Sequence, residues 1–283
     1  MITKDTFYTY AQYNEDIILA ALLMDVRKGF YVDVGANHEE YHSVTKYFYR
    51  KGWRGINIEP IPRLASEFIK KRKRDINLNL AVSNKQGKLI LRDYINHDGL
   101  STLSQQSKQD IDKADLPYED YEVSVDTLKN ILKNNNVKHI DFLKIDVEGY
   151  ESVVLESNDW KKYRPKVICV EANHRQEEWG GYLEDRNYKK FIFDGLNEYY
   201  IADEAFGIID HFAEKATLLS HNSLRNHHAS LWKDDLNRIK LLEDLTDRQD
   251  AIIKSTQLAA ENLQRELDEL RSPIKLLKKL IKK

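Results

Sequence analysis

The sequence predicts an α/β fold in which a doubly wound, mostly parallel sheet carries helices on both faces. Short apolar runs alternate with helix-like stretches from Phe30 to about Ala172, as they do in chains of βαβ units. The runs are almost continuously apolar, which is typical of strands buried on both faces. Polar and acidic residues follow the ends of these runs, at the edge where open parallel sheets bind their ligands.

The individual elements follow in order along the chain. Residues 1–29 form a lead-in whose apolar run Ile17–Met24 predicts a soluble helix, because it is too short to span a bilayer and follows two acidic residues. Strands are predicted at 30–37, 55–60, 76–83, 88–94, 140–147 and 166–172, the fourth of them as a hairpin addition after a turn at 84–87. Helices are predicted at 41–51, 62–74, 125–134 and from 150 onward, with a loop and a short helix over 96–120.

The sheet is expected to end in an antiparallel hairpin. The stretch KKFIFDGLNEYYIADE, Lys189–Glu204, has the pattern of two strands around Gly195. This hairpin completes a central domain of residues 30–208, and a connector of residues 209–234 follows it.

Residues 235–271 are predicted to form a coiled-coil helix. A heptad seam with steps of three and four runs from Ile239 to Leu270, and it is strongest over Leu263–Leu270. Such a seam predicts a homo-oligomer, either a dimer or a trimer. The alternative is a single helix that packs on the central domain.

The last segment, residues 272–283, is predicted to be a basic amphipathic helix. Ser272 and Pro273 supply its N-cap and first residue, and five lysines lie opposite an apolar face. A helix of this kind suits peripheral contact with an anionic membrane surface, each lysine contributing on the order of 1 kcal/mol. A solvated terminus is the alternative.

Charge and cysteine content restrict the class of protein. The formal net charge is −2, so no global basic excess indicates a nucleic-acid partner. The single cysteine, Cys169, lies in an apolar run and is expected to be a buried, inert thiol. Because no disulfide can form, the composition fits a cytoplasmic protein, with any membrane contact confined to the inner face.

The turn after the first strand raises the question of the ligand. FYVDVGAN carries one glycine, Gly35, whereas loops that cradle phosphates carry two or three, and neither G-x-G-x-x-G nor GK[ST] occurs. Glu59 closes the second strand 24 residues later, where a carboxylate can accept hydrogen bonds from both ribose hydroxyls. A nucleoside without a pyrophosphate, such as S-adenosylmethionine, fits this layout, and Asp33 suits its positive groups. The alternative is a structural turn beside an incidental acid.

Several motifs in fixed order resemble the FkbM-type methyltransferases. They are YVDVGAN, SVTKYFYRKGWRGINIEP, LNLAVS, GLSTL, VSVDTL and DFLKIDVEGYE, and the similarity extends from Tyr10 to Glu204. The resemblance implies a Rossmann-like domain that uses S-adenosylmethionine and usually O-methylates a sugar or polyketide hydroxyl. The branch with GWRGINIEP resembles enzymes encoded among surface-polysaccharide genes, which favours a glycan acceptor.

The resemblance also implies roles for individual residues. Asp33, Gly35 and Asn37 are expected at the methionine end of the cofactor, Glu59 at the ribose, Ala81 beside the adenine, and Ser101 and Thr102 near the cofactor's edge. Many relatives carry a second glycine after the GAN turn, where this chain has His38–Glu40. That difference puts the path of the loop beside the cofactor in question.

Methyl transfer to a sugar hydroxyl needs a base or a metal ion, because the hydroxyl is a poor acid. His174 is the first choice of base, since its ordinary pKa of about 6.5 suits proton abstraction near neutrality. Asp146 and Glu171 lie at the neighbouring strand ends and are the other candidate catalytic residues. A divalent ion such as Mg²⁺ held by Asp146, Glu171 and either Asn173 or His174 is the alternative. A plainer role for Asp146 and Glu148 is to cap the helix that follows.

Other residues and other functions stay open at this point. His221, His227 and His228 have no acid or cysteine at ligand spacing and are expected on a solvated face. Five aromatic residues could stack on sugar rings, but they are expected to lie in the core or at an interface. They are Trp179, Tyr182, Tyr188, Tyr199 and Tyr200. The competing functions are a nicotinamide-dependent enzyme and a non-catalytic coiled-coil scaffold with a vestigial domain.

Overall fold

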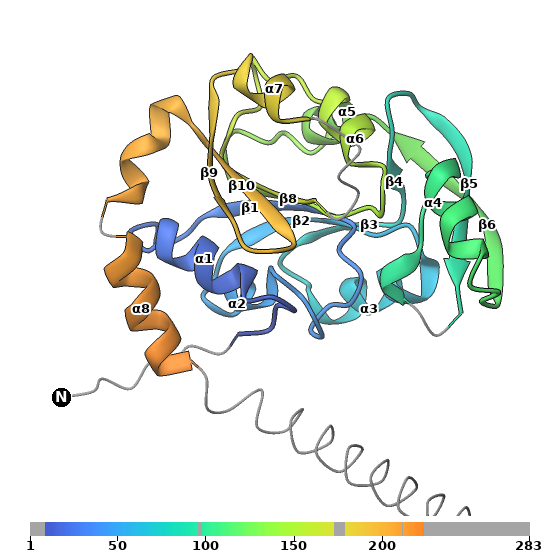
Figure 1. Ribbon diagram of the computed structural model, residues 1–283, viewed down its shortest axis with the longest axis horizontal. Coiled ribbons are helices and arrows are strands. Elements are labelled where there is room, and N and C mark those ends of the chain that lie inside the picture. The colour runs from blue at the N-terminus through green and yellow to red at the C-terminus, as the bar shows by residue number, and fades with distance from the viewer. Residues whose placement is uncertain (1–8, 96–97, 173–178, 211, 224–283) are drawn as a thin grey trace, which may run out of the picture. The chain divides into compact units, whose positions relative to one another are not determined.

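The computed structural model describes residues 9–95, 98–172, 179–210 and 212–223 (Figure 1). The coiled coil predicted at 235–271 and the basic helix predicted at 272–283 lie outside these residues, as do Asn173 and His174. In the described part of the chain, no helix combines the length and the apolar character that crossing a bilayer requires.

A seven-stranded sheet forms the centre of the domain, in the order β3-β2-β1-β7-β8-β10-β9. Neighbours from β3 to β8 pair in parallel, whereas β10 pairs antiparallel with both β8 and β9. The strands of this sheet are β1 Phe30–Val34, β2 Arg54–Ile58, β3 Ile76–Leu78, β7 Ile140–Ile145, β8 Pro165–Glu171, β9 Tyr188–Phe193 and β10 Asn197–Ala202. The α/β prediction and its closing antiparallel hairpin are therefore confirmed.

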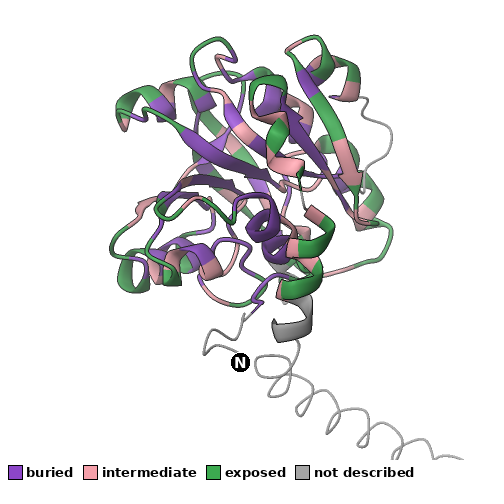
Figure 2. Cartoon of the chain, turned by 90° about the vertical axis from the view of Figure 1, so that its left-hand side faces the viewer, coloured by how far each residue is buried: buried purple, intermediate pink, exposed green. Residues whose placement is uncertain are grey.

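Helices cover both faces of this sheet (Figures 1 and 2). One face packs against α5 Leu128–Asn134, α6 Glu151–Glu156 and α7 Trp179–Glu184, and the other against α1 Glu15–Leu22, α2 Lys46–Arg50 and α8 Phe212–Ser223. Successive strand residues point to opposite faces, so Val32 packs in the first cluster and Tyr31 in the second. Both clusters are removed from water, as the buried colour of the central strands shows (Figure 2).

A second, three-stranded sheet lies beside the first and corrects two predictions. The strand predicted at 76–83 is interrupted at Asn79. The side-chain amide of Asn79 donates hydrogen bonds to the carbonyls of Glu59 and Pro60, which holds the chain out of the sheet at this point. Its first part is β3, and its second part, β4 Ala81–Val82, pairs with β6 Tyr118–Asp126.

The strand predicted at 88–94 also finds a different partner. This strand is β5 Gly87–Tyr94. It pairs antiparallel with β6, whereas a hairpin with the strand at 76–83 was predicted. The sequence analysis assigned the β6 region to a loop and to the start of a helix. The first half of β6 is largely exposed, so its apolar alternation is confined to Tyr121, Val123 and Val125. The remaining elements are α3 Pro62–Lys71, α4 Gln105–Asp112 and two short 3₁₀ helices, Asp98–Leu100 and Asp203–Ile209.

The helix predicted at 41–51 is shorter than expected, because a buried arginine holds the residues before it in a loop. Arg72 is completely buried and donates to the carbonyls of Glu39 and Thr45 at 2.9 and 3.2 Å. It also donates to the hydroxyls of Ser43 and Thr45 at 2.9 and 3.0 Å. These bonds fix the loop that follows β1, and α2 begins only at Lys46.

Arg72→Met is expected to lower the free energy of unfolding by about 3 kcal/mol, because it leaves buried carbonyl and hydroxyl groups without their donors. Urea denaturation measures the change. Arg54→Met, at an exposed position in β2, is the matched control and is expected to change stability by less than about 0.5 kcal/mol. Equal effects of the two substitutions would contradict the role assigned to Arg72.

Candidate functional site

A cavity of about 300 Å³ opens at the carboxyl ends of β1, β2, β7 and β8. That volume is in the range of small-molecule sites. Seven of the candidate cofactor-binding and catalytic residues line it: Gly35, Asn37, Glu59, Ala81, Ser101, Asp146 and Glu171. Two others, Asp33 and Thr102, are buried behind its wall.

The one-glycine turn is explained by backbone packing. Gly35 has φ +76°, and a Cβ added to it would lie 1.8 Å from the carbonyl oxygen of Asp146. The amides of Gly35 and Ala36 both donate to the carbonyl of Ile58 at 3.1 Å, which ties the turn to the end of β2. Glycine is therefore required here for the close approach of β1 and β7, and this requirement is independent of any phosphate.

The loop beyond this turn is held by side-chain contacts. Nδ1 of His38 accepts hydrogen bonds from the amides of Glu40 and Tyr41 at 3.1 and 2.9 Å. The carboxylate of Glu39 is buried and pairs with Lys46 and Lys71 at 3.0 and 2.9 Å. The side chains of His38 and Glu39 thus fix the conformation of this loop.

A buried lysine joins the ends of β1 and β7. Lys144 lies directly opposite Asp33 in the parallel register, with Nζ 3.5 Å from Asp33 Oδ1. The same Nζ lies 3.1 Å from Asp146 Oδ2 and donates to the Gly35 carbonyl at 2.8 Å. Burial disfavours the charged form, but Asp146 and Asp33 outweigh it and raise the pKa of Lys144 above its ordinary value.

Lys144 was not predicted as a site residue, although the sequence contains a signal for it. DFLKIDV has one cationic residue inside a buried apolar strand, and YVDVG has one anionic residue in the corresponding place. A buried charge needs a partner, so the two strands were candidates for pairing in this register. Burial raises the pKa of Asp33, and Lys144 and a hydrogen bond from Thr45 at 3.1 Å oppose that shift.

The β1–β2 half of the cavity contains a buried carboxylate and a half-buried amide. Glu59 accepts from the amides of Asn37 and Ile61, both at 2.8 Å, and burial raises its pKa from 4.5 to about 8 despite these bonds. Asn37 has φ 53°, and its Oδ1 is buried without a hydrogen-bonding partner in the described structure. These two polar groups, with Ala81 beside them, form a place for a ligand that donates hydrogen bonds.

Ser101 and Thr102 have separate roles. Ser101 lines the cavity and donates to Asp93 Oδ1 at 2.7 Å. Thr102 is completely buried, and its hydroxyl donates to the carbonyl of Glu148 at 2.7 Å. Thr102 therefore positions the loop that carries Glu148, and Ser101 is the one that faces the cavity.

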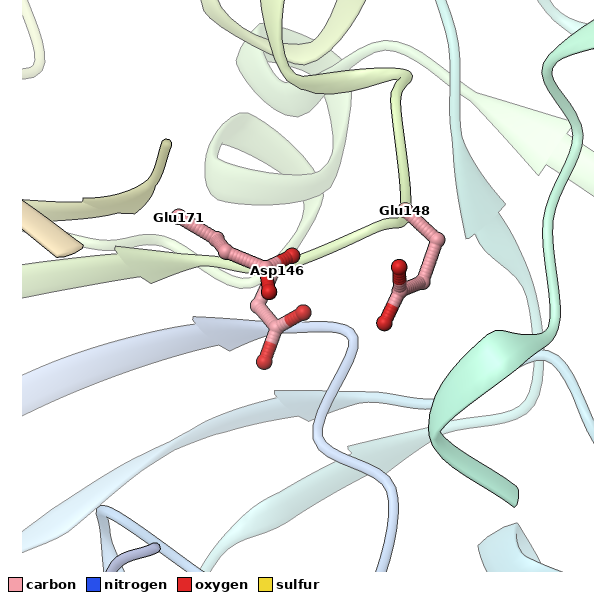
Figure 3. A group of neighbouring side chains, drawn as sticks. All are labelled: Asp146, Glu148 and Glu171. Carbon is pink, nitrogen blue, oxygen red and sulfur yellow. The ribbon is translucent and has the colours of Figure 1, made fainter. Parts of the chain in front are cut away.

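The β7–β8 half of the cavity contains three carboxylates from two strand ends (Figure 3). One oxygen from each of Asp146, Glu148 and Glu171 lies within 4.8 Å of the others. Burial, together with the charges of Asp146 and Glu148, raises the pKa of Glu171 well above its ordinary value. Such a set can share protons or hold a hard cation. Asn173, predicted from the sequence as a third ligand, lies outside the described residues.

The loop before α6 is held by a different acid. Glu151 is completely buried, and its Oε1 accepts from the amides of Val147 and Gly149 at 3.0 and 3.2 Å. Glu148 adopts φ 53° within this loop and lines the cavity beside Asp146. Glu151 thus ties this loop to the first turn of α6.

Other predicted residues lie in the core or outside the described residues. Tyr188, Tyr199 and Tyr200 are buried, as expected, and burial raises the pKa of the Cys169 thiol well above its ordinary value. The side chains of His221, His227 and His228 lie outside the described residues. Three residues of the N-terminal lead-in also line the cavity, although the sequence analysis assigned them no role: Gln12, Tyr13 and Glu15.

Comparison with known proteins gives a family and two solved structures. The profile described as the Methyltransferase FkbM domain matches residues 33–215. A methyltransferase from Geobacter sulfurreducens is 13% identical, with 71% of this chain and 82% of that chain covered and a TM-score of 0.33. A putative RNA methyltransferase from Pyrococcus horikoshii is 8% identical, with 71% and 90% covered and a TM-score of 0.34. A search of curated proteins gave no match.

Gly35→Ala is expected to destabilise the protein more than Gly52→Ala does. Both glycines have positive φ, but a Cβ at Gly52 meets nothing within 4 Å, whereas one at Gly35 collides with the Asp146 carbonyl. The control substitution therefore costs about 1–2 kcal/mol for backbone conformation alone, and Gly35→Ala costs this plus the separation of two strand ends. Urea denaturation of both variants measures the difference, and equal costs would refute the packing role of Gly35.

Glu59→Gln is expected to flatten the dependence of stability on pH. Between about pH 4.5 and 8 the unfolded state loses the Glu59 proton while the folded state keeps it, so wild-type stability falls as pH rises through this window. The variant lacks this titration and should lose less stability across the same window. Urea midpoints at both ends of the window give the slopes, with the exposed Glu156→Gln as control. A slope equal to that of the wild type would contradict the shifted pKa.

Proposed function

The chain belongs to the FkbM methyltransferase domain family, and from that premise we propose that it is an S-adenosylmethionine-dependent O-methyltransferase. Its proposed acceptor is a sugar hydroxyl of a surface glycan or of a glycan precursor. The observation that carries the proposal is the division of the cavity between Glu59 and Asn37 on one side and three carboxylates on the other. One half suits a hydrogen-bond-donating nucleoside, and the other half suits removal of a proton.

The residues of the β1–β2 half fit the proposed cofactor. The unpartnered Oδ1 of Asn37 is an acceptor for an ammonium or hydroxyl group, and Glu59 retains lone pairs for ribose hydroxyls beyond its two backbone bonds. Ile58, Ile61 and Val82 provide apolar wall for a flat aromatic base. The single glycine of the turn is used for strand packing, in keeping with a ligand without a pyrophosphate.

The protein's own part in the reaction is to align the acceptor hydroxyl and to take its proton. S-adenosylmethionine supplies the activated methyl group when bound. The raised pKa of Glu171 keeps that carboxyl protonated near neutrality, so it is suited to donate a hydrogen bond. Asp146 is the proposed acceptor of the hydroxyl proton. Lys144 fixes the orientation of Asp146 beside it. His174, the base favoured by the sequence, remains a proposal outside the described residues.

A divalent cation is the alternative way to acidify the acceptor hydroxyl. Asp146 and Glu171 would hold it, with Glu148 or Asn173 as a third oxygen ligand, a donor set that suits Mg²⁺. Dialysis against a chelator separates the two mechanisms. Full activity afterwards supports the base, and loss that Mg²⁺ restores supports the cation.

The remaining proposals rest on the sequence of the C-terminal segments. We propose that residues 235–271 self-associate as a coiled coil and that residues 272–283 contact the inner face of a membrane peripherally. Both fit an enzyme of the cytoplasm that acts on glycan intermediates assembled at the membrane surface. Truncation after Arg271 should then reduce recovery with membranes on fractionation.

The function is tested by binding and by transfer. Isothermal titration should detect binding of S-adenosylmethionine to the wild type and a loss of about tenfold or more in affinity for Glu59→Gln, since two ribose hydrogen bonds are weakened. Mass spectrometry of glycan from cells with and without the protein should show a mass difference of one methylene unit. Glu156→Gln is the control for binding. Absence of binding heat together with unchanged glycan would reject the proposed function.

A further inference from the structure

The cavity has a wall that lies outside the family-matched residues. Gln12, Tyr13 and Glu15 line it, whereas the family match begins at Asp33. Glu15 receives a contact at 3.4 Å from the amide of Asn197 in β10, next to β8. The lead-in therefore borders the cavity from the β8–β10 direction, across the sheet from Glu59.

Buried polar contacts hold this wall in one conformation. Asp16 is completely buried and accepts from the Thr9 hydroxyl and the Tyr10 amide, both at 2.7 Å, and from the Ala11 amide at 3.4 Å. These three bonds fold the segment before α1 back over the helix start. The wall is thus built by the fold, because an acid inside α1 fixes the backbone that precedes it.

Two further contacts set the direction of the residues at the rim. Asn14 adopts a left-handed conformation with φ 64°, and the Tyr13 amide donates to Glu15 Oε2 at 2.7 Å. The Tyr13 side chain keeps 48% of its surface exposed, although the residue lines the cavity. An aromatic ring is therefore presented at the cavity mouth, with an amide from Gln12 and a carboxylate from Glu15 beside it.

We propose that this wall, Gln12, Tyr13 and Glu15, is the binding platform for the sugar ring of the acceptor, and this inference rests on the proposed function. A sugar ring offers an apolar C–H face that packs on an aromatic ring and hydroxyls that bond amide and carboxylate groups. Asn197, which contacts Glu15, pairs with Glu171 between β10 and β8, so the platform lies on the same side of the cavity as the three carboxylates. The tyrosines on β9 and β10 that were considered for stacking on a sugar are buried in the core, so they cannot reach an acceptor. Tyr13 is exposed at the cavity and can.

Kinetics with Tyr13→Ala test the platform, using methyl glycosides of neutral hexoses as the acceptor panel. We expect KM for the accepted glycoside to rise about tenfold, which corresponds to the loss of one aromatic contact. Tyr13→Phe should retain the wild-type KM, because stacking needs only the ring. The Kd of S-adenosylmethionine, measured by titration, should stay the same in both variants.

Tyr118→Ala is the matched control. Tyr118 is 47% exposed, nearly as much as Tyr13, but it lies on β6 and does not line the cavity. Its replacement should leave KM unchanged, and far-ultraviolet circular dichroism verifies that each variant is folded. Gln12→Ala provides a second change in the platform, with a smaller expected rise in KM of about threefold.

The outcomes separate the two proposals. An active wild type whose acceptor KM is the same in Tyr13→Ala overturns the platform and leaves the methyltransferase proposal standing. A weaker Kd for S-adenosylmethionine in Tyr13→Ala also overturns it, because Tyr13 would then belong to the cofactor half. If the wild type binds S-adenosylmethionine but methylates no glycoside of the panel, the sugar acceptor is rejected and the platform with it.

Discussion

The buried ammonium group of Lys144 is the interaction on which the geometry of the cavity depends. Its three oxygen partners come from β1 and from the end of β7, so one charge connects the two strands at the centre of the sheet. Removing such a cation leaves the buried carboxylate of Asp33 without compensation, which costs more than the ion pair itself contributes. The close approach of Gly35 to Asp146 is the backbone counterpart of the same junction.

The two halves of the cavity depend on this junction in different ways. On the β2 side, Glu59 accepts from the amide of Asn37 in the turn after β1 and from the amide of Ile61 after β2. Arg72 fixes the loop that continues from the turn. On the β8 side, Glu151 and Thr102 hold the loop that carries Glu148. Each half of the cavity is therefore held in place by its own set of buried hydrogen bonds.

The sequence predicted the buried strands and the acids at their ends well, because both follow from local patterns. The strands of the parallel sheet are apolar throughout, and the acids that follow them share one edge by topology. β6 was missed because half of it is exposed and its partner β5 lies beyond a loop. Lys144 and the Gln12–Glu15 wall were missed for a similar reason: their roles arise only when distant segments meet.

The position of α1 has a consequence for how this domain can be cut or transplanted. The family match starts inside β1, so a fragment that begins there would lack part of the central strand and the whole helix that covers Tyr31. It would also expose an apolar face of the sheet to solvent and to other chains. A chimera that exchanges this domain between relatives therefore needs its junction upstream of Thr9. Asp16, its hydrogen-bond donors and α1 then stay with the sheet that α1 covers.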